Sequence, residues 1–202
     1  MKIHWIPILF VALTPCLLSA IDNERQTELH PFPRTFVSTQ TVVLADGLSF
    51  RRTVTRKNDK VRIESGLDKD AYIILDTISR KVTTVLGKTK KFFSVDYTPY
   101  TNYDLMMDDA FLFLGDNRFV AAGREMLSGK EANKFILKPN GSEVHLLLDT
   151  QGNPMRLSSQ NGATYIDWIS FNTQADVDDR LFEIPKDYTP LSLPNLNRNS
   201  IP

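Results

Sequence analysis

The chain has 202 residues, and its 24 basic and 24 acidic side chains give a formal net charge of zero at pH 7. A neutral chain offers no electrostatic argument for binding nucleic acid or an anionic membrane surface. Its length is enough for one domain with a sizeable core, and we expect a single domain over residues 35–190.

The first twenty residues have the pattern of a secretory signal peptide. One cation, Lys2, precedes an apolar run over residues 5–18, and small residues end the segment at Ala20. The run is too short for a comfortable membrane span, and its end is typical of a cleavage site. We therefore expect cleavage after Ala20 and a periplasmic or secreted protein with no later transmembrane segment.

The single cysteine, Cys16, lies inside this predicted signal. Cleavage would leave a chain without a thiol for a disulfide, a nucleophile or a soft metal site, so stability would come from packing alone. The alternative is a lipoprotein acylated at Cys16. Pro15 is a poor fit to the small residue that such processing prefers.

Residues 21–34 are polar and contain Pro31 and Pro33, which indicates a flexible leader. The first strand is expected at residues 36–44, followed by a hairpin turn at Asp46-Gly47. In the returning segment, residues 48–56, apolar and polar side chains alternate with period two, which is typical of a sheet with unlike faces. One face would carry Leu48, Phe50, Arg52, Val54 and Arg56.

Further short strands are predicted at regular spacing, with turn residues between them. They cover residues 60–64, 71–75, 81–86, 90–95, 125–127, 133–137, 143–149, 155–160 and 164–172. Short strands joined by hairpin turns, with hardly any helix, favour an antiparallel meander over a parallel βαβ sheet. The tail, residues 191–202, is rich in proline, asparagine and serine and is expected to be disordered.

Residues 105–114 are the main exception to this β pattern. Met107, Ala110, Phe111 and Leu114 recur at helical spacing. As a lid, their flexible and aromatic side chains would contact an acyl chain. The alternative is an ordinary helix that fills the core of the sheet. A second, short helical turn is expected to begin at Asp178 or Asp179.

The residues needed for catalysis or metal binding are not found in the expected patterns. Beyond the predicted signal the chain has two histidines, His30 and His145, and no Gly-x-Ser-x-Gly motif. Two isolated histidines do not make a zinc site. The acidic groups at 108–109 and 176–179 lack the spacing of an EF-hand loop. We therefore expect no enzyme, no catalytic residue, no metal and no cofactor.

Several segments follow one another in an order that resembles a known superfamily. They are KVRIE at 60–64, YIILD at 72–76, GREMLSGKEANKF at 123–135, VHLLLD at 144–149 and LFEIPKDY at 181–188. Together they resemble the periplasmic LolA-like proteins, which are related to the lipoprotein carrier of the outer-membrane sorting pathway. The resemblance implies a mainly β fold: a strongly curved antiparallel sheet, an incomplete barrel, covered by one or two short helices.

The resemblance also implies ligand-binding residues. Members with a known role carry or sense acyl chains or lipidated proteins in an apolar cavity. Arg56 stands where the carrier has an arginine involved in cargo handling, although Lys57 replaces the carrier's next residue, a proline. Arg56 and Arg62, with Arg52, would line the cavity mouth, or else be solvated charges on the sheet. The cavity and lid would be formed by Met107, Phe111, Leu114 and Trp168, although the Trp168 indole could equally fill the core.

The sequence thus predicts a non-enzymatic periplasmic or secreted binding protein. Its apolar cavity would hold a lipid, an acyl chain or a lipidated partner. The alternative is a structural or regulatory module of the cell envelope, which would bind an envelope protein and fill the cavity with its own side chains.

Overall fold

The computed structural model describes residues 32–97, 119–137 and 143–191. The predicted signal peptide, most of the leader, the segment predicted as a helix at 105–114 and nearly all of the tail lie outside these ranges. The described elements are β1 (Thr35–Val43), β2 (Ser49–Lys57), β3 (Lys60–Ser65), β4 (Ala71–Asp76), β5 (Lys81–Leu86), η1 (Gly87–Thr89), β6 (Lys91–Asp96), β7 (Val120–Leu127), β8 (Lys130–Leu137), β9 (Val144–Leu148), β10 (Pro154–Ser159), β11 (Tyr165–Asn172), η4 (Asp179–Phe182) and β12 (Thr189–Pro190).

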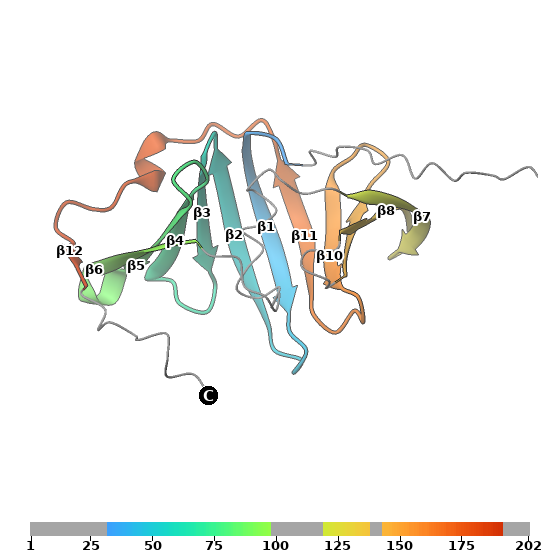
Figure 1. Ribbon diagram of the computed structural model, residues 1–202, viewed down its shortest axis with the longest axis horizontal. Coiled ribbons are helices and arrows are strands. Elements are labelled where there is room, and N and C mark those ends of the chain that lie inside the picture. The colour runs from blue at the N-terminus through green and yellow to red at the C-terminus, as the bar shows by residue number, and fades with distance from the viewer. Residues whose placement is uncertain (1–31, 98–118, 138–142, 192–202) are drawn as a thin grey trace, which may run out of the picture.

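All twelve described strands belong to one sheet, in the order β12-β6-β5-β4-β3-β2-β1-β11-β10-β9-β8-β7 (Figure 1). Strands β1 to β6 form one antiparallel meander and β7 to β11 form a second. The two meanders join where β1 pairs antiparallel with β11, for example Val42 with Ile166. The predicted antiparallel meander is therefore confirmed, and this central pairing completes it.

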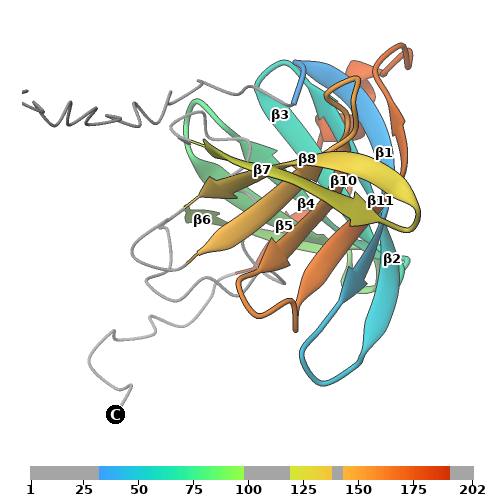
Figure 2. The same cartoon turned by 90° about the vertical axis from the view of Figure 1, so that its right-hand side faces the viewer.

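The sheet is strongly bent and does not close into a barrel. Figure 2 shows β1 and β2 at the crest of the bend, with β6 and the terminal strand β7 turned to the same side. The two terminal strands, β12 and β7, are not paired with each other. The mainly β, curved and open sheet expected from the sequence is confirmed.

The core lies on the concave face, which we call the inner face. Along β1 every second residue is buried, and Phe36, Ser38, Gln40 and Val42 point inward. Residues opposite one another on neighbouring strands share a face, so the apolar side chains of the other strands join them. The resulting cluster contains Phe32, Phe36, Val42, Val54, Val61, Leu75, Phe119, Leu137, Val144, Leu146, Leu148, Leu157 and Ile166.

The C-terminal segment crosses the opposite, outer face. Lys57 donates its Nζ to the carbonyl oxygen of Val177 at 2.7 Å. The helical turn predicted at Asp178 or Asp179 is confirmed as η4. Asp178 caps it, and its side chain accepts the backbone N–H of Arg180 at 2.9 Å. The segment ends in β12, which pairs in parallel with β6 and departs from the otherwise antiparallel pattern.

Strand β7 is longer than its sequence indicates. The pattern predicts a strand only at residues 125–127, whereas β7 begins at Val120. Alanines and a glycine occupy its first half, and the register shifts between Ala121 and Arg124, where Gly123 has a φ of 89°. A bulge of this kind breaks the period-two pattern, so the early part of the strand is not recognisable. Among the described residues, no helix has the length and apolarity needed to cross a membrane.

Candidate functional site

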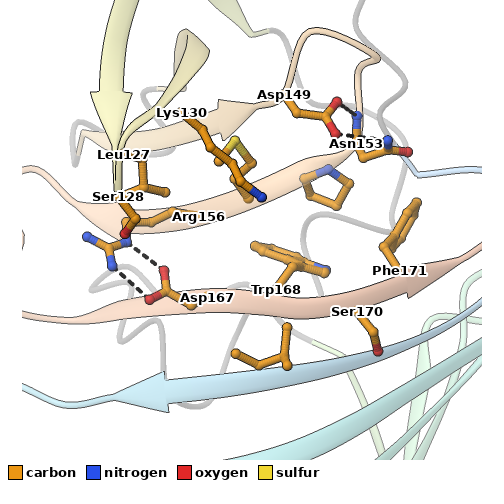
Figure 3. Close-up of a pocket in the computed structure, with 13 residues that line it drawn as sticks. Leu127, Ser128, Lys130, Asp149, Asn153, Arg156, Asp167, Trp168, Ser170 and Phe171 are labelled. Atoms are coloured by element: carbon orange, nitrogen blue, oxygen red, sulfur yellow. Dashed lines mark hydrogen bonds and ion pairs between the residues drawn. The ribbon is translucent and has the colours of Figure 1, made fainter.

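A pocket lies along the strand ends of the bent sheet, where β7, β9 and β11 end and β8 and β10 begin (Figure 3). Its volume is about 430 Å³. We call it the Trp168 pocket. It is lined by Leu127, Ser128, Lys130, Asp149, Asn153, Pro154, Met155, Arg156, Asp167, Trp168, Ile169, Ser170 and Phe171.

Aromatic side chains separate this pocket from the core. The ring of Phe32 lies 5.9 Å from that of Trp168 and 6.5 Å from that of Phe171, between centroids. Phe171 in turn lies 4.9 Å from Phe36, which is fully buried. Such pairs contribute about 0.5–1.5 kcal/mol beyond the area that they bury. The pocket therefore has a rigid apolar wall.

A β-bulge places Trp168 in this wall. Gln40 of β1 pairs with Trp168, whereas Thr39 pairs with Ser170, so Ile169 is the extra residue. Ile169 is 58% exposed, although it lies in a strand. A bulge bends the strand and redirects neighbouring side chains, so Trp168 and Ile169 can both line the pocket.

Three of the four charged groups in the pocket are held by other residues. Arg156 donates to both carboxylate oxygens of Asp167, at 2.6 and 2.7 Å, and this pairing raises the pKa of the guanidinium. Asp149 accepts the backbone N–H groups of Gln151 and Asn153, both at 2.8 Å. Burial tends to raise the pKa of the Asp149 carboxyl, but these and further hydrogen bonds from Asn153 lower it overall.

Two donors of residues that line the pocket have no partner in the described part of the chain. The indole Nε1 of Trp168 is buried and has no hydrogen-bond acceptor there. The ammonium group of Lys130 forms no ion pair with another described residue. In Figure 3 the Lys130 side chain extends into the pocket on the side of Trp168.

Arg56 on β2 and Trp168 on β11 lie on the two strands that flank β1. Arg56 is opposite Phe36 on β1 and therefore on the inner face. Its Nη1 donates to the carbonyl oxygen of Phe32 at 3.3 Å, and its Nε to that of Asn58 at 3.1 Å. Burial lowers the pKa of this guanidinium, and Asp59 partly offsets the effect. Arg56 and Trp168 thus both contact Phe32, Arg56 at its carbonyl oxygen and Trp168 at its ring.

Arg62 is not brought together with them. Arg56 pairs with Val61, so Arg62 lies on the outer face. There its guanidinium stacks on Tyr72, 3.5 Å from the ring centroid, and donates to the carbonyl oxygen of Leu181 at 2.8 Å and to Glu64 at 2.9 Å. In this structure Arg62 holds the C-terminal segment against the sheet.

Replacing Arg62 by methionine should loosen the C-terminal segment while the aliphatic part of the side chain still covers Tyr72. The bond from Arg62 to Leu181 would be lost, and hydrogen bonds from charged donors contribute about 1.5–3 kcal/mol. We expect the amide of Thr189, which donates to Lys90 at 3.0 Å, to exchange its hydrogen about tenfold faster. Amides of β1 serve as the control. Unchanged exchange at Thr189 would show that Arg62 does not hold this segment.

The remaining candidates have different surroundings. Arg52 points inward, is 5% exposed and donates its Nε to Gln40 at 2.7 Å. His145 pairs with Glu143 at 2.6 Å. Met107, Phe111 and Leu114 lie outside the described residues. In the described part of the chain, no group of three or more His, Cys, Asp or Glu side chains could hold a metal ion.

Sequence reasoning did not single out Lys130, Met155 or Phe171 as pocket residues. Lys130 follows Ser128-Gly129, which has positive φ angles of 49° and 79°. Such a turn is a recognisable hairpin signal, so the sequence could have placed Lys130 at a strand end. It could not have placed Lys130 near Trp168, because these residues lie on strands that are far apart in the chain and meet only in the assembled sheet.

Comparison with known proteins shows similarity of fold. No family model and no curated protein sequence matches the chain. An uncharacterized conserved protein from Thermus thermophilus has 13% identity and a TM-score of 0.55, covering 80% of this chain and 91% of that one.

Two further solved structures match less closely. MucB in the Pseudomonas aeruginosa MucA/MucB complex has 12% identity and a TM-score of 0.48, covering 83% of this chain and 62% of that one. A putative outer membrane lipoprotein-sorting protein domain from Vibrio parahaemolyticus has 12% identity and a TM-score of 0.44, covering 73% of this chain and 88% of that one. At these low identities the comparisons show a likeness of fold alone.

Proposed function

We propose that this chain is a non-enzymatic binding protein of the periplasm or the extracellular space, and that it takes up an acyl chain of a lipid or of a lipidated partner. The observation that carries the proposal is the Trp168 pocket. Its volume of about 430 Å³ falls within the range of roughly 300–1,000 Å³ found for small-molecule sites.

The lining of the pocket suits an apolar group. Trp168, Phe171, Ile169 and Leu127 offer aromatic and aliphatic surface. Met155 adds a flexible, polarizable side chain of the kind found at adaptable binding surfaces. The aromatic wall keeps the opening in shape before a ligand arrives, and a preformed pocket loses less entropy on binding.

Two observations support export and the absence of catalysis. The N-terminal twenty residues have the order of charges, apolar residues and small residues found in secretory signals. The sequence has no Gly-x-Ser-x-Gly motif that would supply a nucleophile beside His145.

The chain has a built-in probe for this proposal, because it contains two tryptophans, Trp5 and Trp168. In a Trp5→Phe background, the fluorescence of Trp168 reports on the pocket alone. A dibrominated stearate should quench this fluorescence and saturate. Replacing Trp168 by alanine should weaken stearate binding about tenfold or more in calorimetry, because burying an aromatic side chain contributes roughly 1.5–3 kcal/mol.

The control is Leu48→Ala, which shortens an exposed side chain in the β1–β2 turn and should leave binding unchanged. Native mass spectrometry of protein purified from its own host gives an independent measurement, with a co-purifying acyl species expected. A mass without ligand, together with no saturable quenching, would overturn the proposal.

The second candidate function is an envelope interaction module without a lipid ligand. It is favoured by the packing in the middle of the inner face, where Phe36, Val42, Val54 and Val61 are fully buried. A ligand in the Trp168 pocket would lie beside this packed core and not within it. The same mass spectrum distinguishes the two functions, because the module would be isolated without an acyl species.

A further inference from the structure

Of the four charged side chains that line the Trp168 pocket, three are paired with other described residues and Lys130 is not. Arg156 and Asp167 neutralise each other through two short hydrogen bonds. Asp149 accepts three donors of the β9–β10 turn, at 2.8, 2.8 and 3.0 Å, so its oxygens face that turn. Lys130 is the remaining charge that lines the pocket, and no described residue forms an ion pair with it.

The N–H of Trp168, another residue that lines the pocket, is a second donor without a partner, and it is buried. An indole nitrogen can only donate, and no described residue accepts from it. A buried donor without an acceptor costs about 1–3 kcal/mol. A hydrocarbon chain cannot supply an acceptor, whereas a ligand oxygen would remove this cost. The pocket therefore favours a ligand that brings oxygen atoms as well as apolar carbon.

Local structure directs Lys130 toward the pocket. The two-residue turn Ser128-Gly129 connects β7 to β8, and both residues have positive φ angles. Lys130 is the first residue of β8 and pairs with Leu127, which also lines the pocket. An ammonium group on a flexible stem binds carboxylate and phosphate oxygens as a point charge.

We propose that the ligand of the Trp168 pocket is an amphiphile with an oxyanion head group, a carboxylate or a phosphate, held jointly by the ammonium of Lys130 and the indole N–H of Trp168. This inference rests on the proposed function and adds the head group to it. The aromatic and aliphatic side chains contact the first part of the hydrocarbon chain, next to the head group.

Three ten-carbon probes that differ only in the head group test the inference by isothermal titration calorimetry on the full chain. Decanoate and decyl phosphate carry the two oxyanions, and decanol is neutral. Lys130→Gln should weaken binding of at least one anionic probe about tenfold and leave decanol unchanged. The anionic probe whose binding is weakened more identifies the source of the head group, either a free fatty acid or a phosphate-bearing lipid.

The matched control is Lys81→Gln, because Lys81 is also an exposed lysine that begins a strand, β5, and its replacement removes the same charge. It should bind all three probes as the unmodified chain does. Trp168→Phe keeps an aromatic ring but removes the N–H, and it should weaken the same anionic probe. Circular dichroism checks that each variant is folded.

The outcomes separate this inference from the proposed function. If all three probes bind and Lys130→Gln affects none of them selectively, the head-group inference is overturned while acyl binding stands. If none of the probes binds to the unmodified chain, the proposed function fails and the inference fails with it.

Discussion

Replacing Leu146 by alanine should lower the free energy of unfolding by about 2–5 kcal/mol, the range for deleting a buried leucine side chain. Leu146 is fully buried in the middle of β9. It is opposite Leu157 on β10 and Phe135 on β8, so its removal leaves a cavity between three neighbouring strands. Urea denaturation followed by circular dichroism measures the change.

The matched control is the same substitution at an exposed position. Leu67 is 60% exposed in the turn between β3 and β4, and Leu67→Ala should change the free energy of unfolding by no more than about 0.5 kcal/mol. Equal effects at the two positions would contradict the assignment of the core to the inner face.

The second large effect is expected at Gln40, which supports a buried charge. Arg52 is 5% exposed, is opposite Gln40 in the register of β1 and β2, and donates its Nε to Gln40 Oε1 at 2.7 Å. Gln40 in turn donates to Ser38 Oγ at 3.4 Å. Gln40→Leu removes the acceptor and should lower the free energy of unfolding by about 1.5–3 kcal/mol.

Gln40→Glu is the informative companion because it keeps an acceptor for Arg52. We expect it to be more stable than Gln40→Leu at neutral pH. The adjacent guanidinium would lower the pKa of the new carboxyl in the folded state. Its contribution would therefore be complete above the ordinary pKa of glutamate and lost as the pH falls through the lowered value. If Gln40→Leu unfolds at the same urea concentration as the unmodified chain, Gln40 does not stabilise Arg52.

Most strands could be predicted from local pattern. Period-two alternation and turn residues such as Asp46-Gly47 are sufficient for β1 to β6, because each of these strands pairs with its neighbour in the chain. The first half of β7 could not be predicted, because Ala121, Ala122 and Gly123 carry no alternating signal and the strand is bulged. The two-residue strand β12 is too short to produce any pattern.

The faces of Arg56 and Arg62 show how register decides a site. Both positions are even-numbered and lie on adjacent strands, which suggests that both side chains line the same cavity mouth. The turn between β2 and β3 contains only Asn58 and Asp59, so Lys57 pairs with Lys60 and Arg56 with Val61. Even-numbered residues of β2 therefore share a face with odd-numbered residues of β3, and Arg62 lies on the outer face.

By itself, the sequence determined the β class, the hairpin turns and the inward direction of alternate side chains, because these depend on neighbours within a few residues. The tertiary structure decided which distant residues meet. The pairing of β1 with β11 brings the ring of Phe36 to 4.9 Å from that of Phe171, and the second meander brings Lys130 to the pocket of Trp168. Such long-range pairing depends on the register and bend of the whole sheet, which no local pattern contains.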